Sequence, residues 1–153
     1  MVWWASGVVA EGAPNRVITH RPAPFGIEAI LDGGEGSFYV GGARGVWRFD
    51  GFRYVAEEGY PFRGVNFLAK GQDGALWAGS ANEGLARRAR GGRFEVVERG
   101  GIRGLVSVGD EVYYERTGPL EMVQWKGRQR RGVSLGVSCY LGNPVGNELG
   151  LVC

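Results

Sequence analysis

The stretch Gly74-Ala75-Leu76-Trp77-Ala78-Gly79-Ser80 predicts the fold of this chain. It combines a tight turn at glycine, a short apolar strand that carries a tryptophan, and a second turn built from small residues. A similar stretch, Gly36-Ser37-Phe38-Tyr39-Val40-Gly41-Gly42, lies earlier in the chain and places Tyr39 where Trp77 stands. Each stretch is followed by a further glycine and another apolar segment. The chain is therefore predicted to consist of repeats.

The first complete repeat, residues 26–63, contains four short apolar segments. Glycine or Asp-Gly turns separate them, and short strands joined by such turns are typical of antiparallel hairpins. The same order of segments recurs in residues 64–103 and, less regularly, in residues 104–136. Each repeat is therefore expected to form one sheet of four strands.

The repeats start at Gly26, Gly64 and Gly104, so the first two are nearly equal in length. A period of about 40 residues with four strands per repeat is the signature of a β-propeller blade. We therefore predict an all-β fold, namely a partial or small β-propeller that occupies residues 1–153 as a single domain. Partial blades are expected at residues 2–25 and 137–153.

One large aromatic residue per repeat is expected in the core between adjacent blades. A four-stranded sheet cannot bury both of its faces alone, so each blade must stack on the next one. Tyr39 and Trp77 occupy this position, and Tyr113, or its neighbour Tyr114, corresponds to them in the third repeat. These residues are predicted to stabilise the fold.

The composition favours a folded β-protein over several other classes. Glycine accounts for 29 of 153 residues, while 44% of the residues are hydrophobic and 12% are aromatic. That combination is typical of dense turns between short strands and argues against a disordered chain. The formal net charge of +2 points to no particular partner. No apolar run approaches the ~18 residues that a membrane span needs, and no signal peptide is recognisable at the start.

Two segments of the second repeat resemble a known family. Asp73-Gly74-Ala75-Leu76-Trp77-Ala78-Gly79-Ser80, followed by Gly84-Leu85-Ala86-Arg87, resembles the two-component regulator propeller repeat. The preceding repeat has Phe38-Tyr39 in place of Leu-Trp but keeps Gly45-Val46-Trp47-Arg48, and weaker similarity extends over residues 2–125. The resemblance implies a periplasmic or extracellular sensor in signal transduction, related to hybrid histidine kinase-type proteins. Any kinase or other output domain would lie outside this chain.

The loops before the first strand of each repeat are the predicted ligand-binding sites. Arg63-Gly64 and Arg103-Gly104 recur there one repeat apart, preceded by Phe62 and Ile102 respectively. In a propeller these loops lie at one end of the central channel, so the two arginines would converge. Their guanidinium groups would then grip a carboxylate, a phosphate or sugar hydroxyls. The alternative is that each arginine packs its stem on a neighbouring loop or faces water.

A basic cluster near the end of the third repeat is expected to be a solvated sheet edge. It lacks the interleaved aromatic residues of a nucleic-acid site, and charges at an edge discourage pairing with another sheet. No nucleic-acid partner is therefore expected. The cluster consists of Lys126, Arg128, Arg130 and Arg131.

No metal or cofactor is expected. His20 is the single histidine, which supports neither a metal site nor a catalytic triad. Cys139 and Cys153 are the only cysteines, and each is expected to be a free thiol or, in an exported chain, part of a bridge between adjacent strands. The aspartates in glycine-rich turns are expected to bond their own backbone. They are Asp32, Asp50 and Asp73.

The expected function is a non-catalytic module that senses or binds a small molecule or a glycan. The first alternative is a propeller scaffold for protein–protein contacts. A propeller lyase is the second alternative, but such chemistry needs a general base and His20 is poorly placed for that role. The chain itself is therefore not expected to be an enzyme.

Overall fold

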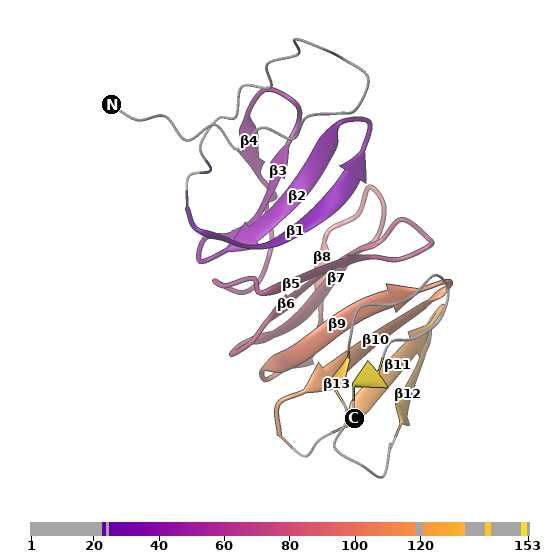
Figure 1. The fold of residues 1–153 in the computed structure, drawn as a ribbon. Helices are drawn as coiled ribbons and strands as arrows, with labels where there is room; N and C mark the ends of the chain where they lie inside the picture. The colour runs from indigo at the N-terminus through magenta and orange to yellow at the C-terminus, as the bar shows by residue number, and fades with distance from the viewer. Residues whose placement is uncertain (1–22, 24, 119–120, 134–139, 142–150, 153) are drawn as a thin grey trace.

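The computed structural model describes residues 23, 25–118, 121–133, 140–141 and 151–152, and its regular structure is entirely β (Figure 1). Three antiparallel sheets of four strands follow one another along the chain. A short antiparallel pair follows the third sheet. The strands are β1 (Ile27–Gly34), β2 (Ser37–Gly42), β3 (Gly45–Phe49), β4 (Tyr54–Ala56), β5 (Phe67–Lys70), β6 (Leu76–Ser80), β7 (Gly84–Arg88), β8 (Phe94–Arg99), β9 (Ile102–Val108), β10 (Glu111–Arg116), β11 (Met122–Lys126), β12 (Gln129–Val133), β13 (Tyr140–Leu141) and β14 (Leu151–Val152).

Each four-stranded sheet keeps its strands in chain order, so every connection within a sheet is a hairpin. The prediction that each repeat forms one four-stranded sheet is therefore confirmed. The third sheet begins at Ile102, slightly before the expected start at Gly104. The partial repeat expected at residues 2–25 lies outside the described residues apart from Ala23 and Phe25, whereas β13 and β14 fall within the expected partial repeat 137–153.

The turns use their aspartates as expected. The carboxylate of Asp73 accepts a hydrogen bond from the backbone N–H of Ala75 at 3.0 Å, and Gly74 has a φ of 78°, which favours glycine. Asp32 accepts from the N–H of Gly34, and Asp50 accepts from two backbone N–H groups of its own turn. These short-range bonds explain why the hairpins can be recognised from the sequence.

The three sheets are stacked face to face in chain order (Figure 1). The first strand of each sheet contacts the first strand of the next sheet: β1 contacts β5, β5 contacts β9, and β9 contacts β13 of the short pair. Ring closure is not observed among the described sheets. The sheets are therefore stacked in the order of the chain, with their first strands adjacent.

Strand β6 lies at the centre of the stack and is buried along its whole length. Leu76 and Ala78 belong to a core cluster with Val46 and Val65, between the first and second sheets. Trp77 points the other way, into a second cluster between the second and third sheets. Successive side chains of a strand point to opposite faces, so this strand supplies both cores.

The small residues after the aromatic position do not form the expected turn. Gly41 lies within β2, and Gly79 and Ser80 lie within β6. A Cβ atom on Gly41 would overlap with the side chain of Val65, which lies in the β4–β5 connection just before β5. Glycine is therefore needed at Gly41 for the close approach of this connection to β2, rather than for a reversal of the chain.

None of the residues that the structure describes forms a helix with the length and hydrophobicity that crossing a bilayer requires.

Candidate functional site

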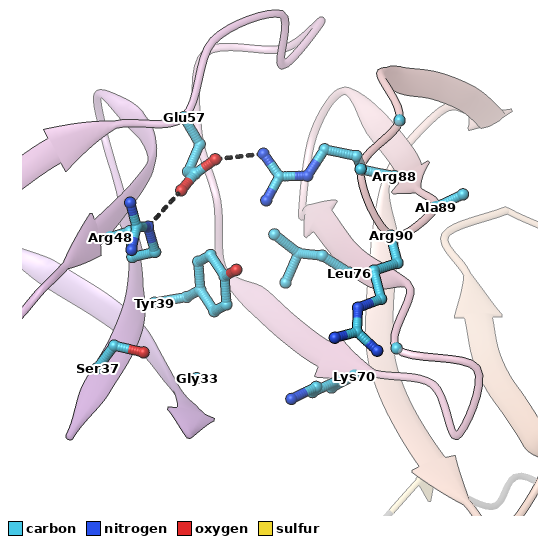
Figure 2. Close-up of a pocket in the computed structure, with 13 residues that line it drawn as sticks. Gly33, Ser37, Tyr39, Arg48, Glu57, Lys70, Leu76, Arg88, Ala89 and Arg90 are labelled. Carbon is cyan, nitrogen blue, oxygen red and sulfur yellow. Dashed lines mark hydrogen bonds and ion pairs between the residues drawn. The ribbon is translucent and has the colours of Figure 1, made fainter. Parts of the chain in front are cut away.

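A cleft of about 450 Å³ lies between the first and second sheets (Figure 2). Its volume is within the range of pockets that hold small molecules, roughly 300–1,000 Å³. The β1–β2, β5–β6 and β7–β8 turns form its rim, because they lie at the same end of the two sheets. The lining residues are Gly33, Ser37, Tyr39, Arg48, Glu57, Lys70, Gly74, Leu76, Arg88, Ala89, Arg90, Gly91 and Gly92.

Two rows of cross-strand neighbours form the walls of the cleft. In the first sheet, Tyr39 lies opposite Arg48 across β2 and β3. In the second sheet, Leu76 lies between Lys70 on β5 and Arg88 on β7. Residues in register share one face of a sheet, so the basic side chains project from the same faces as the core residues Tyr39 and Leu76.

Glu57 joins the two walls. It follows β4, and its Oε1 accepts a hydrogen bond from Arg48 Nε at 3.2 Å while its Oε2 accepts from Arg88 Nη1. The side chains of Glu57 and Arg88 are 14% and 18% exposed, whereas that of Arg48 is 40% exposed. The Arg88 guanidinium also lies over the ring of Phe94, 5.0 Å from its centroid. Glu57 is thus the half-buried centre of an ion-pair bridge between sheets.

Lys70 and Arg90 complete the charge of the cleft. Lys70 is the last residue of β5, and Arg90 lies in the β7–β8 turn, where its aliphatic carbons lie close to Gly74. Both side chains extend into the cleft from the second sheet (Figure 2). Neither forms a hydrogen bond or an ion pair with any residue that the structure describes. Four cationic side chains line the cleft with one carboxylate, which leaves a formal excess of three positive charges.

A second space, of about 340 Å³, lies at the same end between the second and third sheets. Trp77 and Trp125 are among the residues that line it, with ring centroids 5.4 Å apart in an edge-to-face arrangement. Its carboxylates already have partners, since Asp73 pairs with Arg87 at 2.7 Å and Asp110 pairs with Lys126. The cleft between the first two sheets therefore offers the larger set of unpaired charges.

The predicted site residues Arg63 and Phe62 lie at the opposite end of the sheets, in the β4–β5 connection. Arg63 is exposed, and its backbone N–H donates to Glu83 Oε2 at 2.9 Å. Phe62 is half-buried with its ring edge-on to Tyr60, 5.7 Å between centroids. The structure thus presents Arg63 on a loop that Glu83 anchors to the β6–β7 turn.

The corresponding pair of the third repeat differs from the first, because Ile102 and Arg103 lie within β9 and not in the predicted loop before it. Arg103 forms an ion pair with Glu115 at 3.6 Å, and the Glu115 side chain is only 6% exposed. Ile102 is fully buried in the core cluster between the second and third sheets. Ile102 therefore contributes to packing. Glu83 holds the backbone of the Arg63 loop, whereas Glu115 pairs with the Arg103 side chain on β9.

Glu83 makes the β4–β5 connection sensitive to acid. Backbone N–H groups of Gly64 and Arg63 donate to its carboxylate and hold its pKa below the ordinary value of 4.5. The stabilisation that the ionised Glu83 carboxylate gives to the folded state is therefore fully present above pH 4.5. It is lost as the pH falls through the lower pKa that Glu83 has in the folded state. We expect Glu83→Gln to lower the thermal unfolding midpoint at neutral pH, and this difference from wild type to shrink in acid. A difference that is independent of pH would contradict this role of the carboxylate.

The predicted blade-core aromatics occupy three different environments. Trp77 is 1% exposed and packs between the second and third sheets. Tyr39 is half-buried against the cluster between the first and second sheets. Tyr113 is half-buried, and its hydroxyl donates to Glu111 and accepts from Gln124. Its neighbour Tyr114 is fully buried, facing the second sheet, and burial raises the pKa of its hydroxyl to about 12.

The basic cluster near the end of the third sheet is partly neutralised. Lys126 pairs with Asp110 and Glu111, and Arg130 pairs with Glu98 on β8. Arg128 and Arg131 are exposed. His20, Cys139 and Cys153 lie outside the described residues. Among the residues that the structure describes, no group of side chains could hold a metal ion.

Sequence reasoning missed the cleft because its residues carry no motif. Lys70 is separated from Glu57 by the β4–β5 connection, and Arg88 and Arg90 are separated from it by a further hairpin. Each is a common residue near the end of a strand. Comparison with known proteins adds no assignment, because no protein-family model, curated protein or solved structure matches the chain significantly.

Proposed function

We propose that this chain is a non-catalytic ligand-binding module with the architecture of a β-propeller, and that it binds a small molecule in the cleft between its first two sheets. The propeller assignment is supported by three consecutive four-stranded sheets whose first strands contact one another in chain order. In a propeller, each blade buries its faces against its neighbours in this way.

The main observation in favour of ligand binding is the cationic cleft itself. Arg48, Arg88, Lys70 and Arg90 present N–H donors around one open space. Guanidinium and ammonium groups stay protonated at neutral pH, so they suit binding better than proton abstraction. Glu57 carries the single carboxylate of the lining, and both of its oxygens already accept bonds from guanidinium groups. The cleft is therefore better suited to holding a ligand than to general base catalysis.

The position of the cleft supports a sensory role. One wall belongs to the first sheet and the other to the second, so a bound ligand would contact both sheets. Binding would then favour one relative arrangement of the two sheets over others. The sequence resemblance to sensor propellers supports the same role, with the output activity in a domain outside this chain.

The proposal can be tested with a fragment library of mixed charge. Backbone amide signals of the isotopically labelled chain would be followed by two-dimensional NMR during titration. We expect at least some fragments to shift the amides of Gly33, Ser37, Gly91 and Gly92, which line the cleft. If shifts are confined to the residues around Arg63 and Arg103, the binding site is the one the sequence predicts and the cleft is not the site. If no fragment shifts any amide, the ligand-binding function is contradicted.

A further inference from the structure

The charge of the cleft indicates the chemical class of its ligand. Resting on the ligand-binding function proposed above, we propose that the cleft recognises a soluble organic phosphate monoester, with the phosphate between the first-sheet and second-sheet cations and the organic group against Tyr39. The structural basis is the juxtaposition of the Arg48–Glu57–Arg88 bridge with Lys70 and Arg90.

The bridge leaves donors for a second anion. Each guanidinium has five N–H donors, and only one from Arg48 and one from Arg88 are bonded to Glu57. Glu57 compensates one of their two charges and fixes the orientation of both side chains. The arginines are therefore held in place before a ligand arrives, which reduces the entropy lost on binding.

Lys70 and Arg90 supply the positive charge that remains uncompensated. They enter from the second sheet, and no described residue forms an ion pair with either of them. Two unpaired cations that share one cleft repel each other, whereas an anion between them would be attracted to both. Their placement therefore favours an anionic ligand over a neutral or cationic one.

The size of the charge excess favours phosphate over a single carboxylate. The lining residues carry three more positive than negative charges. A phosphate monoester carries about −1.5 to −2 charges at neutral pH and has three acceptor oxygens, whereas a carboxylate carries one charge on two oxygens. Phosphate can therefore accept bonds from more of these cations at once.

The apolar part of the cleft is suited to contact the organic group of the phosphate monoester. Tyr39 and Leu76 lie among the basic residues, and both belong to or pack against the core cluster between the sheets. Tyr39 is half-buried and its ring lies beside the open space (Figure 2). A flat or apolar substituent on the phosphate would cover this ring, which inorganic phosphate would leave exposed to water.

The test compares three probes that share one ring: phenyl phosphate, benzoate and phenol. The full chain is titrated with each, and the amide shifts of Gly33, Ser37, Gly91 and Gly92 report on the cleft. We expect phenyl phosphate to bind most tightly of the three and phenol most weakly. Inorganic phosphate, titrated as a fourth probe without a ring, should bind more weakly than phenyl phosphate. Raising the salt concentration should weaken phenyl phosphate binding and leave phenol unaffected.

Two variants and a matched control test the residues. Arg90→Gln and Lys70→Gln are each expected to weaken phenyl phosphate binding about tenfold, the effect of one charge-assisted hydrogen bond. Arg93→Gln removes the same charge from the same turn but outside the cleft lining, so it should leave binding unchanged. Both cleft variants should fold, because each removes one of two mutually repelling cations.

The outcomes separate this proposal from the proposed function. If neutral or cationic fragments bind in the cleft and phenyl phosphate does not, the cleft is a binding site but not one for phosphates. If Arg93→Gln weakens binding as much as Arg90→Gln, the effect is general attraction and the phosphate site is wrong. Binding to phosphatidic acid vesicles without binding to phenyl phosphate would assign the cleft to a lipid headgroup and overturn the soluble ligand. If no probe or fragment binds, both proposals fail.

Discussion

Replacing Trp77 with alanine is expected to lower the free energy of unfolding by about 3–5 kcal/mol. Trp77 is 1% exposed and lies in the cluster that joins the second and third sheets, where its ring meets Trp125 edge-on. Truncation would remove the contacts of the ring with both sheets and leave a cavity beside β6, a strand that is buried on both faces. The loss therefore combines the lost apolar burial with the energy of the cavity.

Chemical denaturation followed by circular dichroism would measure this loss. Phe52→Ala is a matched control, because Phe52 is also aromatic but is 80% exposed in the β3–β4 turn. Its effect should stay within about 0.5 kcal/mol. Trp77→Phe keeps an aromatic ring and should fall between the two. A Trp77→Ala variant as stable as Phe52→Ala would mean that the second and third sheets do not stack around this residue.

Replacing Glu57 with glutamine is expected to destabilise the chain by about 2–3 kcal/mol. Removing one partner of a buried ion pair costs about 3–5 kcal/mol, because the remaining charge is left without compensation. Glu57 and Arg88 are largely shielded from water, but Arg48 is 40% exposed and is partly screened by solvent. The expected loss is therefore below the value for a fully buried pair.

The glutamine variant keeps the shape of the side chain, so its effect reports on charge. Glu95→Gln on β8 is the matched control: Glu95 is exposed, and its replacement should change stability by less than about 0.5 kcal/mol. High salt should narrow the gap between wild type and Glu57→Gln only partly, because half-buried pairs are screened less than exposed ones. Equal stability of the two variants would show that Glu57 does not hold the first two sheets together.

The sheets can be predicted because their determinants are local. Turns at Asp73-Gly74 and its equivalents depend on residues close together in the chain, and strand alternation depends on a period of two. The role of the small residues is less evident from the sequence. Gly41 reads as a turn residue there, yet its lack of a side chain serves the contact with Val65, which lies 24 residues later in the connection between β4 and β5.

The site cannot be predicted to the same extent. Arg63 and Arg103 stand out because they recur at one position of the repeat, and the structure places both at the end of the sheets opposite the cleft. Neighbouring repeats also differ where their sequences look equivalent. Phe62 packs on Tyr60 at the surface, while Ile102 at the corresponding position is fully buried in the core.

By itself, the sequence determined that this protein is built from repeats that each form a four-stranded β-sheet, and that Trp77 belongs to the core. These properties follow from turn chemistry and from the alternation of side chains along a strand, which act over short stretches of chain. Only the tertiary structure decided that Arg48 and Glu57 of one sheet would meet Lys70, Arg88 and Arg90 of the next. The stacking of the sheets sets which faces and which strand ends come together, and that register depends on packing across the whole interface rather than on any local pattern.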